Sequence, residues 1–185
     1  MANPLKVGVV ILLVLYPFLI YFGLNYFRPS QLGLFFLVLF IIRVFVTKTK
    51  SKTARWQLIF AVVIGGTLAM LTWIFDSEKY LLWYPVGMSA AFFLIFTATI
   101  IYPPSIIEQI GRTYNKNFNE AAAIYTRKVT MVWSAFFGVN IFVSGWTVLY
   151  GGIEVWTLYN GLISYIIVGI LLGAEILVRK FVVHK

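Results

Sequence analysis

Long runs of apolar residues alternate with short polar segments along most of the chain. A helix needs about 20 mostly apolar residues to cross a membrane, because each residue adds about 1.5 Å and the hydrocarbon core is about 30 Å thick. Six runs approach this length and predict six transmembrane helices, over residues 5–26, 32–47, 58–75, 80–102, 129–150 and 161–178. The expected fold class is therefore an all-α polytopic membrane protein.

Composition strengthens this interpretation. The chain has 185 residues, of which 61% are hydrophobic and only 11% are charged, and its mean hydropathy is +0.91. An ordinary soluble domain carries roughly 25% charged residues. Because no Ser-, Pro- or Gly-rich linker interrupts the chain, we expect one integral membrane domain over residues 1–185, with cytoplasmic loops at 48–56 and 103–128.

Two of the six runs have features that could argue against their being transmembrane helices. The run 32–47 is short and contains Arg43, but this residue is near one end, where a long side chain can extend to the headgroups. The run 5–26 is too long for the core of a secretory signal, and residues 25–28 offer no small-residue cleavage site. We expect both runs to remain in the membrane.

The distribution of Lys and Arg predicts the orientation. With the N-terminus in the cytoplasm, 13 of the 15 basic residues lie on the cytoplasmic side, and only Arg28 and Lys79 lie outside. Positively charged loops stay on the cytoplasmic side of a membrane. The sequence therefore predicts a multi-pass protein of the bacterial inner membrane with both termini in the cytoplasm.

The net charge of +9 does not indicate nucleic-acid binding, because the basic residues are spread over short segments beside the helices. Such residues determine topology and attract anionic lipid headgroups, at roughly 1 kcal/mol per residue near the surface. Membrane lipids are thus the first expected partners.

The second and third helix hairpins resemble each other. Trp73 and Trp83 bracket one outer turn, Trp146 and Trp156 bracket the other, and in both a Gly and then a Ser follow. This pattern is expected if the chain contains repeated helix hairpins of the same orientation. It is equally expected if tryptophan simply marks the membrane interface.

The loop 103–128 is longer than a helix connection requires. After Pro103 and Pro104, apolar and polar residues alternate at helical spacing and predict a short interfacial helix. Its apolar face contains Ile106, Ile107 and Ile110, and its polar face contains Glu108, Gln109 and Arg112. A second helix is expected to begin after Asn119 as its N-cap. This loop is either a binding surface or a plain amphipathic connector.

A few polar residues fall within the spans. Arg43 and Glu175 are the ionisable ones, and Glu175 stands four residues before Arg179, the favourable order for a helical ion pair. Both residues either reach the headgroups or contact another helix. Asn140, together with Ser144, Ser164 and Thr97, is expected to form hydrogen bonds between helices.

The residue types argue against catalysis. The chain has no cysteine, and its single histidine is the penultimate residue, His184. It contains no glycine-rich phosphate loop, no Ser-His-Asp set and no paired carboxylates. We therefore expect no enzyme activity, no cofactor and no metal.

Three segments resemble a family of uncharacterised bacterial inner-membrane proteins. They read YPPSIIEQIGR at 102–112, YTRKVTMVWSAFF at 125–137 and WTLYNGLISY at 156–165. That family is encoded beside acyl carrier proteins, acyl-AMP ligases and dehydratases in aryl polyene and related fatty-acyl gene clusters. The layout is also distantly similar to the intracellular septation protein A family, through GGTL at 65–68, the outer tryptophans and WSAFF at 133–137.

The first resemblance implies a non-catalytic membrane protein that anchors or supports acyl-carrier-dependent lipid or aryl polyene synthesis. The basic inner face suits an acidic acyl carrier protein. The candidate contacts with a partner or with lipid are Glu108, Arg112, Lys116, Tyr125, Arg127 and Lys128. The alternatives are a septation or envelope scaffold acting on other membrane proteins, and a small lipid or polyene transporter, which would need a cavity. A homo-oligomer is left open.

Overall fold

The computed structural model describes residues 4–47, 52–114 and 118–182. All regular secondary structure in these ranges is helical, which confirms the all-α class. The helices are α1 (Pro4–Val14), α2 (Tyr16–Gly23), α3 (Pro29–Val46), α4 (Lys52–Phe75), α5 (Lys79–Leu82), α6 (Tyr84–Ile101), α7 (Ile106–Tyr114), α8 (Glu120–Trp146), α9 (Gly152–Leu158) and α10 (Ser164–Val182). Two π-helical turns, Thr147–Gly151 and Tyr159–Ile163, flank α9.

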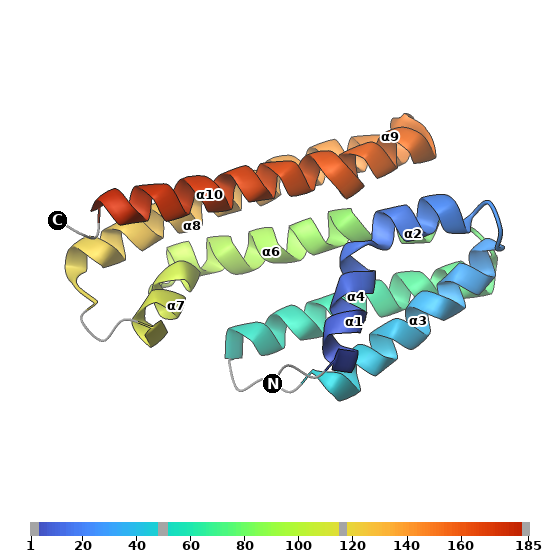
Figure 1. Cartoon of the computed structure of the whole chain (residues 1–185), viewed down its shortest axis with the longest axis horizontal. Coiled ribbons are helices and arrows are strands. Elements are labelled where there is room, and N and C mark those ends of the chain that lie inside the picture. Colours follow the sequence, from blue (N-terminus) through green and yellow to red (C-terminus); the bar gives the residue numbers. More distant parts are fainter. Residues whose placement is uncertain (1–3, 48–51, 115–117, 183–185) are drawn as a thin grey trace.

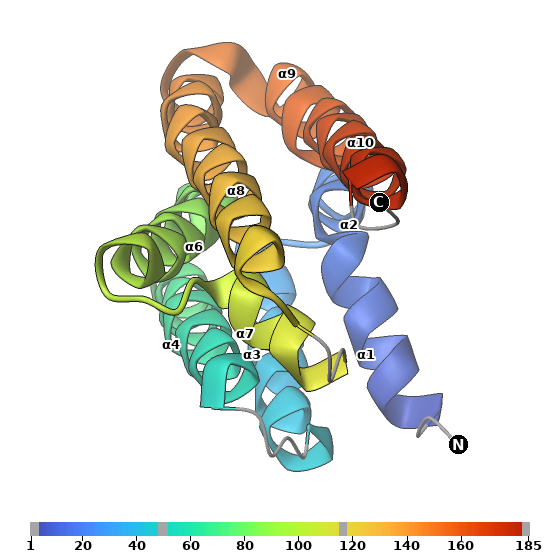
Figure 2. The ribbon, with the colours of Figure 1, turned by 90° about the vertical axis from the view of Figure 1, so that its left-hand side faces the viewer.

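Four helical stretches of the described chain are long and apolar enough to cross a membrane: Pro29–Val46, Arg55–Phe75, Lys79–Ile101 and Glu120–Val178. The last contains both α8 and α10, which run in opposite directions and are joined at one end through α9 (Figures 1 and 2). The chain turns back at Gly152, whose φ of 67° is a left-handed conformation that favours glycine. These lengths and compositions are those of a membrane protein.

The expected continuous helix over 5–26 is wrong, because this segment forms two helices. Pro17 lies in the first turn of α2 and has no N–H to donate. Its ring also clashes with the carbonyl four residues earlier in a continuous helix. Helix α1 therefore ends at Val14, and it runs across the long axis of the molecule while α2 runs along that axis (Figure 1).

The long helices form a ring in the order α1, α3, α4, α6, α8 and α10 (Figure 2). The ring closes where the Tyr165 hydroxyl of α10 donates to the Val14 carbonyl of α1, at 2.8 Å. Helix α9 marks one end of this bundle and α7 the other, as Figure 1 shows. We call them the α9 end and the α7 end.

Helices α3 and α4 pack closely because glycines stand at their contact. A Cβ on Gly33 would lie 2.7 Å from the backbone nitrogen of Trp73, so no larger residue fits at this approach. Further along the pair, the Phe40 ring lies directly over Gly65, where a Cβ would come within 2.0 Å of its Cζ.

The α9 end is closed by an aromatic cluster, which we define as Tyr16, Phe36, Phe40 and Trp156. Each of these side chains is at most 1% exposed. The ring of Tyr16 has its centroid 4.8 Å from that of Phe36 and 6.2 Å from that of Trp156. The Trp156 Nε1 donates to the Leu82 carbonyl at 3.0 Å, and the Tyr16 hydroxyl donates to the Leu81 carbonyl. These bonds satisfy carbonyls at the end of α5.

The predicted helix in the loop 103–128 is confirmed as α7, but its polar face is only partly as expected. Ile106 is buried and Ile110 is exposed, whereas Glu108 is 8% exposed and points into the protein rather than toward solvent. Helix α7 packs on α8 and α6. The predicted cap is also confirmed, since the Asn119 side chain accepts a hydrogen bond from the Ala122 N–H at 2.9 Å.

Candidate functional site

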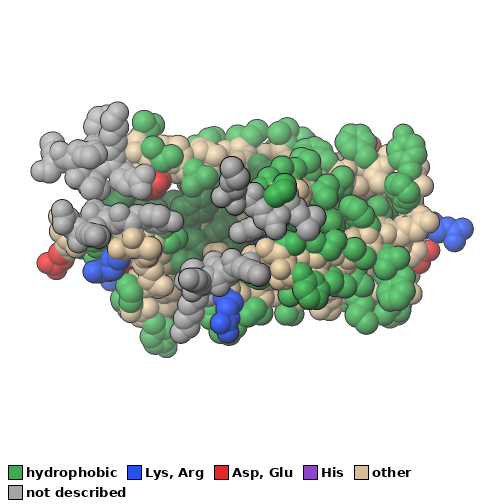
Figure 3. Space-filling view, turned by 60° about the horizontal axis from the view of Figure 1, so that its bottom comes forward, with side chains coloured by type: hydrophobic (Ala, Val, Ile, Leu, Met, Phe, Trp, Pro, Cys, Tyr) green, Lys and Arg blue, Asp and Glu red, His purple; other side chains and the backbone are tan. Residues whose placement is uncertain are grey.

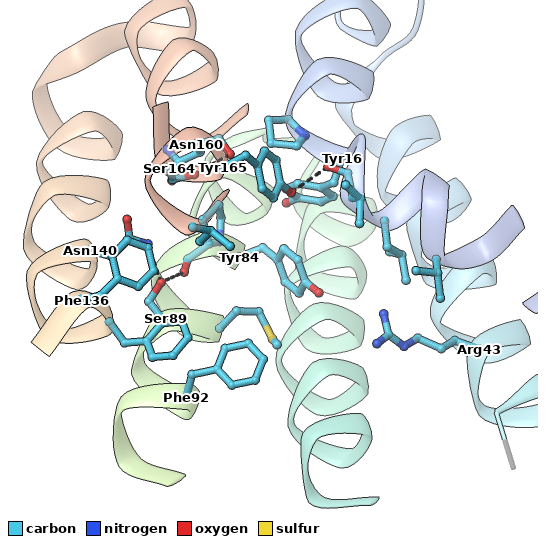
Figure 4. A pocket seen from close by; sticks show the side chains of 18 residues that line it. Tyr16, Arg43, Tyr84, Ser89, Phe92, Phe136, Asn140, Asn160, Ser164 and Tyr165 are labelled. Atoms are coloured by element: carbon cyan, nitrogen blue, oxygen red, sulfur yellow. Dashed lines mark hydrogen bonds between the residues drawn. The ribbon is translucent and has the colours of Figure 1, made fainter. Parts of the chain in front are cut away.

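A central cavity of about 300 Å³ lies inside the ring of helices. Residues from α1, α2, α3, α6, α8 and α10 line it, and Figure 4 shows their side chains. The apolar lining residues include Val10, Leu13, Met88, Phe92, Phe136 and Phe137. The polar ones are Arg43, Tyr84, Ser89, Asn140, Asn160, Ser164, Tyr165 and, from the aromatic cluster, Tyr16. The cavity is therefore apolar over most of its wall. Arg43 projects toward it from α3, apart from the polar groups around Tyr16 and Asn160 (Figure 4).

A second cavity of about 320 Å³, which we call the α7-end cavity, adjoins the first. Phe92 and Phe137 line both cavities, and their rings stack with centroids 5.0 Å apart. Helix α7 contributes Ile107 and Ile110, and α10 contributes Glu175. The face nearest the viewer in Figure 3 is hollowed, and hydrophobic side chains line the hollow.

Asn140 joins α8 to its neighbours in the wall of the central cavity. Its Nδ2 donates to the Ser89 hydroxyl of α6, and its Oδ1 accepts from the Tyr159 hydroxyl, both at 2.8 Å. The expected hydrogen bond between helices is thus confirmed for this residue. Because its amide is engaged on both sides, Asn140 holds the wall together.

The other predicted polar contacts follow the same pattern. The Ser144 hydroxyl donates to Asn160 Oδ1 at 2.6 Å, and the Thr97 and Ser134 hydroxyls join α6 to α8 at 2.7 Å. Ser164 differs, because its hydroxyl donates to the Asn160 carbonyl one turn earlier. Three of the four predicted bridges therefore connect separate elements, and the fourth stays within its own helical stretch.

Arg43 differs from these groups because part of its guanidinium has no hydrogen-bond partner. It points from α3 toward the central cavity and Tyr84 (Figure 4). Its Nε is buried and has no hydrogen-bond partner in the structure, and no carboxylate within the described ranges pairs with it. Arg43 is partly exposed and lies in the last turn of α3, and no hydrogen bond from its Nε joins α3 to another helix.

Tyr84 lies between Arg43 and the aromatic cluster. Its ring packs 4.8 Å from Tyr16 and 5.6 Å from Phe40, measured between centroids. Its hydroxyl points toward the side of Arg43 (Figure 4), and none of the described residues forms a hydrogen bond with it. A cation and a hydroxyl donor thus face the same cavity.

Glu175, the second ionisable residue expected within a span, is half-buried and lines the α7-end cavity. Its backbone carbonyl accepts a hydrogen bond from the Tyr125 hydroxyl of α8 at 3.2 Å. The predicted pair with Arg179 involves a side chain outside the described residues.

The predicted partner contacts lie at the α7 end, but the chain already engages several of them. Arg112 bonds Glu108 Oε1 through Nε at 3.0 Å and Nη2 at 2.8 Å, and its guanidinium lies 4.9 Å from the centre of the Phe118 ring. The Arg127 Nη2 donates to the Ile100 carbonyl at 3.3 Å.

Lys128 of α8 is exposed, and Lys116 lies outside the described residues. The predicted contacts therefore do not form one cluster of free cations, although Arg112, Arg127 and Lys128 all remain exposed. A docking role for them stays a prediction.

Sequence reasoning missed the cavity residues Met88, Phe92 and Phe137, because nothing in an apolar run distinguishes a cavity wall from a packed interface. Arg43 was singled out, but the direction of its side chain depends on how α3 faces the ring. Tyr84 had one available signal, since it is a polar aromatic residue just inside a span.

This arrangement can bind a molecule that is mostly apolar and has one polar end. The described residues contain no group of three His, Asp or Glu side chains able to hold a metal ion. Comparisons of the chain with family models, with curated proteins and with solved structures give no match. The resemblances to bacterial membrane-protein families therefore remain predictions.

Proposed function

We propose that this protein binds an elongated, amphipathic molecule of the lipid class inside the membrane. The observation that carries this proposal is the pair of adjacent, largely apolar cavities, which end at polar groups and at the closed aromatic cluster. Ligand sites have volumes of about 300–1,000 Å³, apolar walls and a few fixed polar groups. Protein interiors otherwise contain few voids larger than a water molecule.

In this proposal the chain crosses the bacterial inner membrane six times, with the α7 end in the cytoplasm. The basic residues favour this orientation, since Arg55, Arg112, Arg127 and Lys128 belong to the α7 end. The two cavities then receive their ligand from the cytoplasmic side, and the aromatic cluster closes the route outward. Reporter fusions after residues 50, 116 and 185 should behave as cytoplasmic, and fusions after residues 76 and 152 as external.

Repeated helix hairpins are part of the proposal. The sequence of a long helix, a short helix and a long helix occurs in α4, α5 and α6 and again in α8, α9 and α10. The paired tryptophans differ in their surroundings, because Trp83 is exposed while Trp156 is fully buried. The order of the elements thus supports a repeat more strongly than the tryptophans do.

Photolabelling would test ligand binding directly. The purified protein in lipid nanodiscs is exposed to a fatty acid that carries a photoactivatable diazirine in its chain, and the labelled residues are mapped by mass spectrometry. We expect adducts on Met88, Phe92 and Phe137, which excess palmitate should remove. Adducts on lipid-facing residues such as Leu94, which is 62% exposed, should not saturate.

Two variants on the same helix provide the control. Met88→Trp places a larger side chain in the central cavity, whereas Leu94→Trp adds the same side chain on the outer surface of α6. We expect the first to abolish saturable labelling and the second to preserve it. Labelling confined to outward-facing residues in the wild-type protein would refute the proposed function.

A second proposed role is the docking of an acidic partner such as an acyl carrier protein at the α7 end. The exposure of Arg112, Arg127 and Lys128 favours it. Changing all three to Gln should leave membrane insertion intact but reduce co-purification of the partner, and the remaining association should depend less on salt. If the triple variant recovered the partner as well as the wild type does at low and high ionic strength, these residues would serve only to determine membrane topology.

A further inference from the structure

Arg43 is the charged residue of the central cavity, and the fold provides no partner for its buried Nε. A guanidinium inside a membrane domain is costly unless it is paired. Apart from the Tyr84 hydroxyl, the other polar side chains discussed above have partners, for example Asn140 with Ser89 and Tyr165 with the Val14 carbonyl. Arg43 Nε has none, and neither Asp nor Glu occurs among the described residues that line this cavity.

We propose that the ligand is a single-chain carboxylate of the fatty-acid class, whose carboxylate is bound by the guanidinium of Arg43 and the hydroxyl of Tyr84. This inference rests on the proposed function and specifies its ligand. An anionic headgroup removes the cost of the unpaired cation, and Arg binds carboxylates through two parallel hydrogen bonds.

The charges in the cavity favour a carboxylate over a phosphate. Arg43 is the single cation among the described lining residues, and a carboxylate carries one negative charge. A phosphomonoester carries about −1.5 to −2 charges near neutral pH and is usually bound by several cationic groups. One guanidinium and one hydroxyl therefore match a carboxylate in both charge and hydrogen-bonding capacity.

The apolar chain then extends from Arg43 toward the α7 end. Phe92 and Phe137 line both cavities, so the chain passes along these rings into the α7-end cavity. There Ile107 and Ile110 of α7 contribute apolar surface. The small volumes of the two cavities, about 300 and 320 Å³, suit one chain rather than a complete diacyl lipid.

Competition between headgroups tests this assignment. The diazirine fatty acid labels the protein in nanodiscs at alkaline pH, and unlabelled palmitate, palmityl alcohol and a monoacyl glycerol phosphate compete with it. The proteins compared are the wild type, Arg43→Gln and Arg55→Gln. Arg55 provides the matched control because it is exposed at the α7-end terminus of α4.

In the wild type and in Arg55→Gln, palmitate should compete at a concentration at least about tenfold lower than the alcohol does, because hydrogen bonds between charged groups are stronger than those of a neutral hydroxyl. In Arg43→Gln the acid and the alcohol should compete equally. Tyr84→Phe keeps the ring contacts, and we expect it to weaken palmitate binding by about two- to tenfold.

Thermal unfolding shows whether a variant is folded and reports binding independently. Palmitate should raise the Tm of the wild type and of Arg55→Gln, but not that of Arg43→Gln, whose own transition should stay cooperative. Equal competition by acid and alcohol in the wild type, or an acid preference retained by Arg43→Gln, would overturn the assignment of Arg43.

Stronger competition by the monoacyl phosphate than by palmitate would overturn the choice of a carboxylate. In all these cases a saturable site for an apolar chain would still exist, so the proposed function would stand. A complete lack of saturable labelling in the wild type would instead refute the proposed function, and this inference with it.

Discussion

The two ends of the helix bundle are built differently. At the α9 end, Tyr16 and Trp156 are at most 1% exposed, and aromatic rings fill the space between α2, α3, α6 and α9. Toward the α7 end, two cavities of about 300 and 320 Å³ remain. Both are lined by α6, α8 and α10, the first also by α1, α2 and α3, and the second also by α4 and α7. The interior of the ring is therefore filled at the aromatic cluster and open toward the α7 end. A further apolar pocket, of about 590 Å³, lies between α2 and the start of α3 at the α9 end.

This difference arises from the size of the side chains and from how closely the backbones of neighbouring helices pack. Glycines let α3 and α4 come together, and the bulky aromatic residues of the cluster fill the rest of the α9 end. Around the cavities, α6 and α8 pack through rings such as Phe92 and Phe137, and hydrogen bonds of Asn140 and Tyr165 add links between helices. Individual hydrogen bonds position helices but do not fill volume.

The largest effect should come from removing the buried ring of the aromatic cluster. Trp156→Ala leaves a cavity and deprives the Leu82 carbonyl of its donor, so we expect a loss of about 3–5 kcal/mol in unfolding free energy. Trp146→Ala, at an exposed tryptophan of the same hairpin, should cost well under half of that. Unfolding in mixed detergent micelles measures both, and equal losses would contradict a tightly packed aromatic cluster.

Substitutions at two glycines test whether the close packing of the α3 and α4 backbones stabilises the α9 end. Gly33→Val would push its side chain into the α4 backbone at Trp73, and we expect a destabilisation of about 1–3 kcal/mol. Gly169→Val on α10 has open space around its Cβ and should be nearly neutral. A destabilised Gly169→Val protein would show that α10 has a close neighbour, such as a second copy of the chain.

Only part of the difference between the two ends of the bundle could be predicted from the sequence. Hydrophobic run lengths located α3, α6 and α10 and most of α4 and α8, because membrane thickness determines how long such runs must be. They did not distinguish Trp83 from Trp156 or predict that Arg43 faces a cavity, since both depend on the packing order of the helices. Pro17 was a visible signal for the break between α1 and α2, and the expectation of a continuous helix ignored it.

A smaller effect is expected from the hydrogen bond between Ser89 and Asn140. A double-mutant cycle with Ser89→Ala and Asn140→Ala should give a coupling free energy of about 0.6 kcal/mol, as is average for hydrogen bonds between membrane helices. The cycle is measured by the same unfolding assay. A coupling of several kcal/mol would mean that the cavity wall is as firmly fixed as the aromatic cluster.

The smallest effect concerns Asp76 at the α9 end. Hydrogen bonds from the Ser30 side chain and backbone lower the pKa of this exposed carboxyl. Its ionised form is thus favoured by folding, so its contribution is present near neutral pH and disappears as the pH falls through the folded-state pKa. Asp76→Asn should lower the Tm slightly at pH 7, and the difference from wild type should vanish in acid. Glu154→Gln serves as the control.

Cysteine accessibility tests the central claim most directly, because the natural chain has no cysteine. Single cysteines replace Met88 in the central cavity, Glu154 on α9 and Lys128 on α8, and a membrane-impermeant thiol reagent is applied to either side of oriented membrane vesicles. We predict that Met88→Cys reacts only from the cytoplasmic side, as Lys128→Cys does, and that palmitate slows this reaction. Glu154→Cys should react only from outside. Modification of Met88→Cys from the outer side would contradict a cavity closed by the aromatic cluster.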